Sequence, residues 1–575
     1  MKMTRIVIQN FSSIKDADID INNVNAIVGR NNSGKSSLLR ALNAFFNFEE
    51  ECLSFRNKEH CYTFQTKSVI TLHFDLSGFQ QEFEQFTSNG HLIVQSIFEL
   101  KANECTQKIK YKINGSFHQD DSRECLDLIK KHIEFILIPP NRNASALKQK
   151  QQNVLNLLVQ SIMRGATENR DNYSKKFRIP IEYLNNHALK DISDQATKEF
   201  LQGKNLKISI KHSKELNYED FLKDIDITIE EFGRVHPLLE LGTGIQSLTI
   251  ISLYHLYGKL KEKNIVIGLE EPETNLHPQS QRELIFYFKN LVKDAHIHQL
   301  FFTTHSAQLI DEIEHTDIIL FKKIQDVKRG YKSVVKQIAK NFFSKYGLEE
   351  FKYYQFHKYR NSDFLFSEYV VITESKTELE LIKEMGRING KNYLHPSISF
   401  VNLDGEKNLK YIIHLLKDLS ISYLLIIDKD VLTHYKNEDV KNSLDSKGFP
   451  TYKNEYKDPS LVNLLIPLKK DQVQLLNHLK NNHTSALNIL EKYSIISMAY
   501  CTELDLVKIK SAQESYYNKL NIKDNERTLQ KLLASKNSLK KIENILEVIK
   551  SIKPRSWPYT YSRIKKAMDK ICRDL

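Results

Sequence analysis

The chain has 575 residues, of which 41% are hydrophobic, and a formal net charge of +12. This length predicts several domains of about 100–200 residues each, and the scarcity of glycine (18) and proline (12) argues against long disordered linkers. No apolar run approaches the ~18 residues of a membrane span, the N-terminus has no signal-peptide layout and the six cysteines form no CxxC pair, so we expect a cytoplasmic protein with reduced thiols and no membrane partner.

The first 140 residues alternate as strands do around one amphipathic helix. The predicted elements are strands at Ile6–Phe11, Asp18–Ile21 and Asn25–Val28, a helix at Ser36–Phe46, and strands at Val69–Leu76, His91–Leu100, Lys108–Ile113 and Phe135–Ile138. This pattern predicts a mixed α/β domain.

A phosphate-binding loop joins the third predicted strand to the helix. Residues 29–36 read Gly-Arg-Asn-Asn-Ser-Gly-Lys-Ser, which matches GxxxxGK[ST] in the strand–loop–helix context that the pattern requires. The glycines let backbone N–H groups approach the phosphates of ATP, Lys35 reaches the β/γ-phosphates, and the Ser36 hydroxyl is a ligand for Mg²⁺. The predicted nucleotide contacts in and beside this loop are Gly29, Asn31, Asn32, Ser33, Gly34, Lys35, Ser36 and Ser37.

From about residue 145 to 232 the sequence becomes polar and mostly helical by pattern, and we expect an insertion that serves dimerisation. Residues 233–340 return to an α/β pattern. There we predict a strand at Ile265–Leu269, a helix at Ser280–Asp294 and a strand at Gln299–Phe302.

Three further motifs add to the predicted nucleotide site. The strand at 265–269 ends in Glu270, which suits contact with Mg²⁺ through its water shell, and Glu271, which suits polarising an attacking water. A solvated acidic turn would have the same sequence. Gly242 and Gly244 open a helix and expose N–H groups that can meet the γ-phosphate of ATP held by a second subunit. His305 is a candidate γ-phosphate contact, although a lone histidine is more often structural.

The order of these motifs resembles the ABC-type ATPase head of SMC-like proteins, over roughly residues 1–320. The resemblance makes 242–246 the signature loop, 275–278 the D-loop and His305 the switch histidine. It implies ATP sandwiched between two subunits, and therefore a homodimer or a higher homo-oligomer. The absence of heptads and of transmembrane segments argues against an SMC arm or a transporter.

Residues 341–366 have the composition of a connection, and a βαβαβ series follows. Its predicted elements are Tyr369–Thr373, a helix near Glu378–Arg387, Ser397–Leu403, a helix near Asn408–Leu419 and Tyr423–Ile427. Such alternation predicts a parallel sheet. Residues 470–575 are predicted to be mainly helical.

Acidic residues follow two of these strands. Glu374 ends the first strand, Glu378 lies on the first turn of the next helix, and Asp428 and Asp430 follow the third strand. Strand ends at one edge of a parallel sheet are where such folds place ligands, and clustered carboxylates suit Mg²⁺ or Mn²⁺. Acids on solvated loops are the alternative.

This pattern resembles the Toprim fold of topoisomerases, primases and certain nucleases. The turn at 404–405 fits the glycine of that family, whereas Ser375 stands where the family usually has glycine. An ABC-type head followed by a Toprim domain resembles the OLD (overcoming lysogenisation defect) nuclease family over almost the whole chain. The resemblance implies DNA cleavage at two metals, one bound by Glu374 and Asp428 and the second by Glu378 and Asp430.

The resemblance also implies a later acid and a C-terminal lysine. The nearest matches are Glu503 and Lys553, with Asp505 and Lys550 as rivals. A basic stretch surrounds the lysines and is predicted to lie along the DNA backbone, since clustered cations attract phosphates. Its members are Lys540, Lys541, Lys550, Lys553, Arg555, Arg563, Lys565, Lys566 and Lys570.

The sequence therefore predicts an α/β protein made of an ABC-type ATPase domain with a helical insertion and a Toprim domain with a helical C-terminal extension. The predicted boundaries are 1–144, 145–232, 233–340, 341–366 and 367–575. The predicted activity is an ATP-regulated, divalent-metal-dependent DNA endonuclease with a catalytic set that includes Glu271.

The family resemblance implies an effector of bacterial anti-phage defence, either stand-alone, Gabija-like or retron-associated. The partner would be a helicase-like protein, or a retron reverse transcriptase with its RNA and DNA. Three alternatives remain open: an ATP-dependent DNA repair or recombination protein whose Toprim domain only binds DNA, a topoisomerase-like enzyme with a tyrosine nucleophile, and an ATP-gated scaffold.

Overall fold

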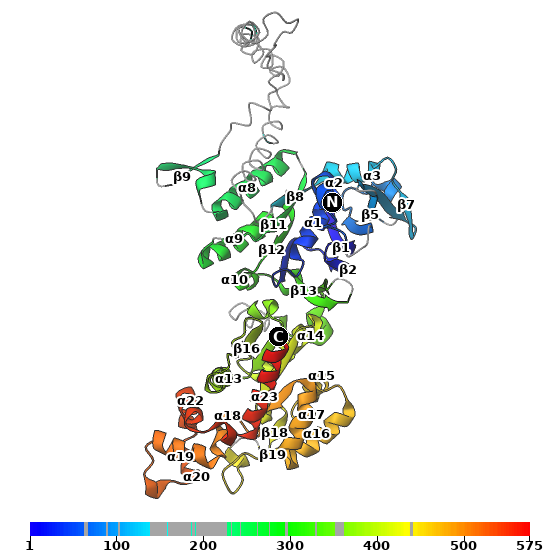
Figure 1. The fold of residues 1–575 in the computed structure, drawn as a ribbon. Helices are drawn as coiled ribbons and strands as arrows, with labels where there is room; N and C mark the ends of the chain where they lie inside the picture. The colour runs from blue at the N-terminus through cyan, green and yellow to red at the C-terminus, as the bar shows by residue number, and fades with distance from the viewer. Residues whose placement is uncertain are drawn as a thin grey trace, which may run out of the picture. The chain divides into compact units, whose positions relative to one another are not determined.

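The computed structural model describes residues 1–62, 67–87, 90–101, 104–138, 227–231, 233–241, 243–261, 263–274, 276–293, 297–327, 330–350, 362–437 and 441–575, with single positions at 158, 186 and 190. The predicted insertion, the signature-loop Gly242 and part of the predicted connection lie outside the described residues. The chain divides into two compact units, and Figure 1 shows the elements of each. The first contains Met1–Ile27, Asn31–Leu309 and Phe321–Val335, and the second contains Val28–Arg30, Ile310–Leu320 and Lys336–Leu575.

A 12-stranded sheet forms the core of the first unit. In spatial order its strands are β7 (Ser116–Gln119), β6 (Glu104–Ile113), β5 (His91–Lys101), β4 (Lys67–Asp75), β1 (Lys2–Phe11), β2 (Ile14–Asp20), β14 (Gly330–Gln337), β13 (Ile318–Asp326), β3 (Val24–Gly29), β12 (Ile297–Thr303), β11 (Asn264–Glu270) and β8 (Ile133–Ile138). The strands from β7 to β2 pair antiparallel, whereas β3, β12, β11 and β8 pair parallel.

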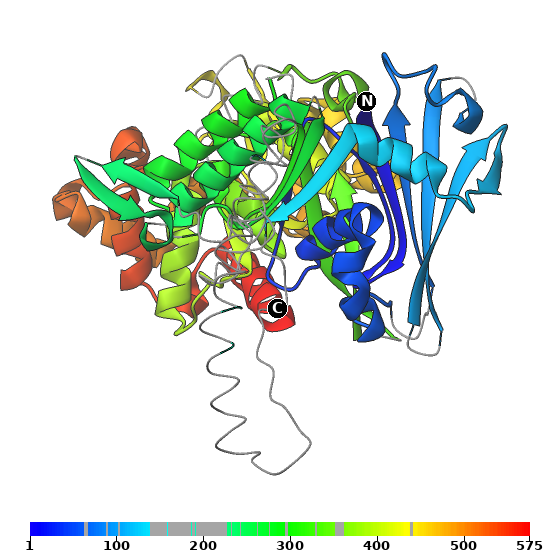
Figure 2. The ribbon, with the colours of Figure 1, turned by 90° about the horizontal axis from the view of Figure 1, so that it is seen from above.

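The parallel strands are apolar along their length because both faces are covered. All residues of Val24–Gly29 are buried, and so are six of the seven residues of Asn264–Glu270. Figure 2 shows α1 on one face of these strands and α8 and α9 on the other. The helices of this part are α1 (Lys35–Phe46), α2 (Phe48–Arg56), α3 (Glu124–His132), α8 (Thr243–Lys261), α9 (Pro278–Leu291) and α10 (Ala307–Ile310), and a separate hairpin consists of β9 (Thr228–Glu231) and β10 (Arg234–Pro237).

The second unit is built on a four-stranded parallel sheet. Its strands, in spatial order, are β16 (Ile398–Asn402), β15 (Tyr369–Thr373), β17 (Ser422–Ile427) and β20 (Ile495–Ser497). The crossover helices are α13 (Lys376–Ile388) and α14 (Leu409–Asp418), so the predicted βαβαβ series is present. Strand β20 lies in a region that we predicted to be mainly helical; at three residues, it is too short for its sequence to predict a strand.

The rest of the second unit is mostly helical, and one hairpin follows β17. The helices are α11 (Phe342–Tyr346), α15 (Pro459–Leu465), α16 (Lys469–Asn481), α17 (His483–Leu490), α18 (Thr502–Val507), α19 (Lys510–Lys519), α20 (Leu529–Ala534), α21 (Lys536–Leu539), α22 (Ile542–Ser551) and α23 (Tyr559–Asp574), and the hairpin consists of β18 (Thr433–Tyr435) and β19 (Tyr452–Tyr456). Helices α22 and α23 pack on α13, which bears Glu378 on its first turn. No described helix is both long and apolar enough to cross a membrane.

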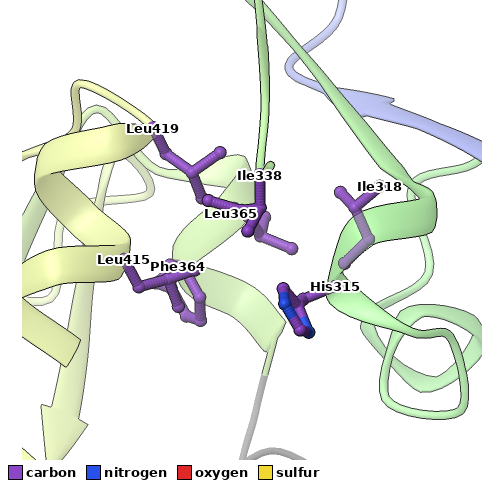
Figure 3. A pocket seen from close by; sticks show the side chains of 7 residues that line it. All are labelled: His315, Ile318, Ile338, Phe364, Leu365, Leu415 and Leu419. Atoms are coloured by element: carbon purple, nitrogen blue, oxygen red, sulfur yellow. The ribbon is translucent and has the colours of Figure 1, made fainter. Parts of the chain in front are cut away.

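A small apolar cavity lies within the second unit (Figure 3). Its lining residues are His315, Ile318, Ile338, Phe364, Leu365, Leu415 and Leu419. The rings of Phe342 and Phe343 meet the imidazole of His315 edge-on, with centroids 5.6 and 4.8 Å away. Burial lowers the pKa of His315 to about 4, so this imidazole is neutral at physiological pH.

Candidate functional site

The phosphate-binding loop lies at the carboxyl edge of the parallel strands. Strand register pairs Glu270 with Thr303, and Thr303 with Ile27, so the loops that follow β11, β12 and β3 leave the sheet at the same edge. This edge is where open α/β sheets bind ligands. The predicted loop, Glu270-Glu271 and His305 therefore meet, although they are far apart in sequence.

The geometry of the loop requires glycine at position 34, the second glycine of the GxxxxGK[ST] pattern. Gly34 has φ of 98° and precedes the first residue of α1. A Cβ on Gly34 would lie 2.2 Å from Ser333 Oγ and 2.3 Å from Ser13 Oγ. The Ser333 hydroxyl also donates to the backbone carbonyl of Ser33 at 2.6 Å. Serines from two distant segments therefore form a floor beneath the loop and leave no room for a side chain.

Lys35 and Ser36 are placed to meet phosphate and metal. Burial lowers the pKa of Lys35 to about 8, against the nearby charges of Glu271 and Glu273, which raise it. Burial also raises the pKa of Glu270, and the Ser36 hydroxyl, hydrogen-bonded to that carboxylate, opposes the shift. Glu270 Oε1 is buried and has no hydrogen-bond partner among the described residues, as expected for an oxygen that faces a cation. This set suits Mg²⁺–ATP.

Glu271 and His305 face each other across the same edge. Their side chains approach to 3.7 Å, from His305 Nε2 to Glu271 Oε1. Burial and the charge of Lys35 lower the pKa of His305. Glu271 has a left-handed backbone (φ 47°), and its N–H donates to the Thr303 carbonyl at 3.1 Å. The water-polarising role of Glu271 remains a prediction.

Glu273 is a residue of this site that the sequence reading missed. Its Oε1 accepts hydrogen bonds from the Thr304 hydroxyl at 2.8 Å and from the His305 N–H at 2.7 Å. Glu273 thereby holds the loop that carries His305. The signal was available, since Glu273 is the third acid of the segment Glu270-Glu271-Pro272-Glu273.

Two other predicted nucleotide contacts have different surroundings. The Ser37 hydroxyl donates to Ser12 Oγ at 3.1 Å and lies 3.4 Å from Ser13 Oγ, so its side chain is used within the protein. Gly244 lies in α8. Its contact with a second subunit, like that of Gly242, remains a prediction.

The second site is a cluster of carboxylates at the end of the parallel sheet in the second unit. Strands β15 and β17 are adjacent and in register, with Thr373 opposite Ile426, so the acids that follow them converge. One oxygen each from Glu374, Asp428 and Asp430 lies within 4.8 Å of the others. We call these three residues the acid triad.

Among the described residues, no lysine, arginine or histidine forms an ion pair with the acid triad. Burial raises the pKa of Glu374 to about 7, and the charge of Asp430 adds to that shift. Burial and the charge of Glu374 raise the pKa of Asp428 well above its ordinary value. Asp428 Oδ1 is buried without a hydrogen-bond partner among the described residues. Three converging hard oxygens, on carboxylates of which one has an unpaired oxygen, fit Mg²⁺ or Mn²⁺.

Glu378 lies beside the acid triad but is already engaged. Its Oε2 accepts from the Ser375 N–H at 2.9 Å and from the Ser375 hydroxyl at 2.5 Å. Its Oε1 accepts from the Thr502 hydroxyl at 2.6 Å. Ser375 and Glu378 form a capping box at the start of α13. The structure thus places Glu378 in a supporting position, and its role as a ligand of a second metal remains a prediction.

Ser375, the departure from the usual glycine, causes no strain. Its backbone is extended (φ −137°, ψ 173°), a conformation that any residue adopts, and its side chain caps α13 by accepting from the Thr377 N–H. The serine therefore strengthens the helix start that carries Glu378.

The predicted later acid, Glu503, and its rival, Asp505, have different surroundings. Glu503 is buried, and its charge contributes to the raised pKa of Asp428. Its rival Asp505 instead accepts hydrogen bonds from the N–H groups of Ala499 and Tyr500 and from the Thr560 hydroxyl, at 2.8–2.9 Å. Asp505 thus holds the loop before α18, whereas the charge of Glu503 acts on Asp428 of the acid triad.

The lysine nearest to this acid is Lys540, whose Nζ lies 3.7 Å from Glu503 Oε1. The sequence reading included Lys540 only within the basic stretch. Lys550 pairs with Glu384 at 3.7 Å, and Lys553 is exposed. Among the described residues, no hydrogen bond or ion pair joins either of them to the acid triad. The predicted role of Lys553 therefore remains a prediction, and Lys540 is the one of these three lysines that pairs with Glu503.

Tyr435 also reaches the acid triad, without any sequence signal. Its hydroxyl donates to Asp430 Oδ2 at 2.8 Å, and burial raises the pKa of Tyr435 above its ordinary value, so the phenol stays protonated. Thr502 and Tyr435 lie on α18 and β18, and no motif links them to the strands that bear the acids.

Comparisons with known families agree with this two-site arrangement. The family described as "AAA ATPase domain" matches residues 1–310, and the family described as "Overcoming lysogenization defect protein-like, TOPRIM domain" matches residues 365–430. These matches confirm the predicted order of an ATPase head followed by a Toprim domain.

The chain is also similar to two proteins named as nucleases. It is 24% identical over 464 residues to the OLD nuclease of Thermus scotoductus, covering 75% of this chain and 82% of that protein. It is 23% identical over 471 residues to the endonuclease GajA of Bacillus cereus, covering 75% of each. Among solved structures, the SMC head domain from Thermotoga maritima aligns with 59% of this chain and 100% of its own length, at 15% identity and a TM-score of 0.32. That likeness is too distant to add to the strand order above.

Proposed function

We propose, from the premise that this chain belongs to the AAA ATPase-domain family and carries an OLD-like Toprim domain, that it is an ATP-regulated, divalent-metal-dependent DNA endonuclease. The observation that carries the proposal is the acid triad, whose carboxylates converge with an unpaired oxygen and raised pKa values. Both relatives named above are nucleases by name, which supports the choice of nucleic acid as substrate.

Each group in the Toprim site has a distinct proposed task. Glu374, Asp428 and Asp430 would hold the cation, which when bound polarises the scissile phosphate and lowers the pKa of a water nucleophile. Glu503 would accept the proton of that water. Lys540, beside Glu503, would stabilise the charge that develops on the phosphate oxygens. Exposed residues of the basic stretch would bind the DNA backbone.

The first unit would bind ATP and control when cleavage occurs. Lys35 and Ser36 would contact the phosphates and Mg²⁺, Glu270 would complete the metal shell, and Glu271 would polarise the attacking water. A second copy of the chain would complete the site through Gly242 and Gly244. The domain boundaries and the dimerisation role of 145–232 belong to the same proposal.

A plasmid assay tests the activity. The full-length chain should nick or linearise supercoiled plasmid with Mn²⁺ or Mg²⁺, and Glu374→Ala should abolish cutting while nucleotide binding persists. Lys35→Ala should lose nucleotide binding while Mn²⁺ binding persists. Cleavage by Glu374→Ala at the wild-type rate would refute the assigned site, and a wild-type protein that binds DNA without cutting it would favour the repair protein.

The cellular role that we propose is anti-phage defence, alone or with a helicase-like or retron partner. The expected result is fewer plaques on cells that express the wild-type chain, and protection should require both Lys35 and Glu374. Protection that needs Lys35 alone would instead indicate an ATP-gated scaffold.

A further inference from the structure

The hairpin β18–β19 begins immediately after the second aspartate of the acid triad. Residues 429–431 form one turn of 3₁₀ helix, and β18 starts at Thr433. Tyr435 is the last residue of β18, and its hydroxyl returns to Asp430, donating to Oδ2 at 2.8 Å. The hairpin therefore folds back on the carboxylate from which it departs.

The ring of Tyr435 is held by neighbouring rings. Tyr435 is paired with Tyr452 across the hairpin, and the two rings stack with centroids 5.2 Å apart and an angle of 27° between their planes. Tyr452 in turn lies 6.5 Å from Tyr500 at 28°, and Tyr500 lies 5.1 Å from Phe449 at 26°. This row of four rings ties the hairpin to the loop before α18.

Two lysines make cation–π contacts with rings of this row. Lys429 Nζ lies 4.7 Å from the Tyr452 ring centroid and donates to the Leu479 carbonyl at 2.7 Å. Lys508 Nζ lies 4.5 Å from the Tyr500 ring centroid. Such cation–π contacts restrict the rings further. Because the ring has little freedom to move, the Tyr435 hydroxyl is a fixed donor.

The hydrogen bond from the Tyr435 hydroxyl to Asp430 Oδ2 affects how Asp430 can bind a metal ion. It orients the Asp430 carboxylate and engages one lone pair of Oδ2, while the other lone pairs of the carboxylate stay available to a cation. Hydrogen bonds of this kind to metal ligands are typically worth 10–100-fold in metal affinity.

We propose that Tyr435 is a positioning residue of the Toprim site, which sets the affinity for the divalent cation by fixing Asp430. The row of rings provides the rigidity that this task requires. The inference rests on the proposed metal site of the preceding section. It adds a residue from outside the acidic motifs and assigns a purpose to the hairpin.

The test is a direct Mn²⁺ titration of the full-length protein by calorimetry, with plasmid cleavage measured in parallel. Tyr435→Phe retains the ring and its stacking and removes only the hydroxyl. We expect its Kd for Mn²⁺ to rise about tenfold, with cleavage at saturating Mn²⁺ within about twofold of wild type. Tyr452→Leu, which removes the stacking partner, should shift the Kd in the same direction while the hydroxyl is retained.

The chain offers a matched control. The Tyr493 hydroxyl donates to Asp471 Oδ2 at 2.7 Å, the same pair of groups without contact with the acid triad. Tyr493→Phe should leave the Kd for Mn²⁺ unchanged, and circular dichroism of all three variants should match wild type. If Tyr435→Phe binds Mn²⁺ as tightly as wild type, the positioning role is refuted.

Two other outcomes are separable from that one. If wild type binds Mn²⁺ no better than Glu374→Ala does, the acid triad is not the metal site and the proposed function fails first. If denaturation traps a covalent protein–DNA adduct that Tyr435→Phe abolishes, Tyr435 is a nucleophile, which overturns the positioning role and supports a topoisomerase-like reaction.

Discussion

Gly34 shows how one residue can decide whether the nucleotide site forms. Its left-handed backbone alone disfavours other residues by about 1–2 kcal/mol. The serine floor adds a steric conflict, with Ser333 Oγ 2.2 Å from the position of a Cβ. A substitution must therefore displace the loop or the serines.

We expect Gly34→Ala to weaken binding of a fluorescent ATP analogue by at least about tenfold, equivalent to ~1.4 kcal/mol. Gly115→Ala is the matched control, because Gly115 also has a positive φ (85°) but no atom within 4 Å of the position that a Cβ would take. It should be less stable toward urea and bind the analogue normally. Equal binding of the analogue by both variants would show that Ser13 and Ser333 can move aside to make room for a side chain at position 34.

The buried imidazole of His315, which lines the apolar cavity, makes the free energy of unfolding depend on pH in the acidic range. Its pKa is 6.5 in an unfolded chain and about 4 when buried, so between these values the unfolded state binds a proton that the folded state does not. The contribution of His315 to the free energy of unfolding is fully present above pH 6.5. It falls by about 1.4 kcal/mol per pH unit as the pH decreases from 6.5 to 4.

Urea denaturation at pH 7 and pH 5 measures this effect. His315→Leu places an apolar side chain against the apolar lining of the cavity. Its free energy of unfolding should fall by about 2 kcal/mol less than that of wild type between pH 7 and pH 5. The comparison with wild type cancels the titration of other groups. An identical pH dependence for both proteins would exclude His315 as the source.

The residues that could be predicted from sequence are those that end a strand. Glu270, Glu374 and Asp428 follow apolar runs, and parallel pairing then brings such ends to one edge. Tyr435 and Lys540 could not be predicted, because a hairpin register and the packing of α21 decide where their polar atoms lie.

At the level of elements, α18 separates two acids that the sequence could not distinguish. Glu503 and Asp505 are two residues apart, so they point in different directions from one helical turn. Asp505 accepts three hydrogen bonds from Ala499, Tyr500 and Thr560, whereas Glu503 pairs with Lys540 and its charge acts on Asp428.

This division predicts opposite phenotypes. Asp505→Asn places amide hydrogens against donors, and we expect it to cost about 1–3 kcal/mol of unfolding free energy. Glu503→Gln should change stability by less than about 0.5 kcal/mol and reduce the cleavage rate by about 10²-fold or more. Urea denaturation and plasmid cleavage of both variants provide the check, and a stable but inactive Asp505→Asn would reverse the two assignments.

The lengths of the strands in the second unit explain which of them could be predicted from the sequence. The strands β15 and β17 have five or six residues each, mostly apolar, and were predicted nearly to their ends. Strand β20 has three residues and acquires its conformation only by pairing with β17. The Ser-x-x-Glu spacing of residues 375–378 is that of a capping box, so the sequence is compatible with both a capping role and a metal-binding role for Glu378.

For the whole molecule, Lys35 of the nucleotide site belongs to the first compact unit, and Glu374 of the acid triad belongs to the second. A ligand that binds only the folded state stabilises it by about 2.7 kcal/mol at 100 times its Kd. We therefore expect one substitution to abolish the stabilisation by Mn²⁺ and a different substitution to abolish the stabilisation by nucleotide.

Differential scanning calorimetry can test this separation. Mn²⁺ without nucleotide should raise the Tm of wild type and of Lys35→Ala but not of Glu374→Ala. A non-hydrolysable ATP analogue in Mg²⁺ should raise the Tm of wild type and of Glu374→Ala but not of Lys35→Ala. Loss of both responses in either variant would mean that the two sites do not form independently.

The serine floor of the phosphate-binding loop also bears on how the protein can be dissected. Ser333 lies on β14, and its N–H donates to the Ser13 carbonyl at 2.9 Å while its hydroxyl supports the loop. The match to the ATPase family ends at residue 310, before this strand. A fragment truncated there would lose a wall of its own nucleotide site, so an ATPase fragment made for expression must extend through Gln337.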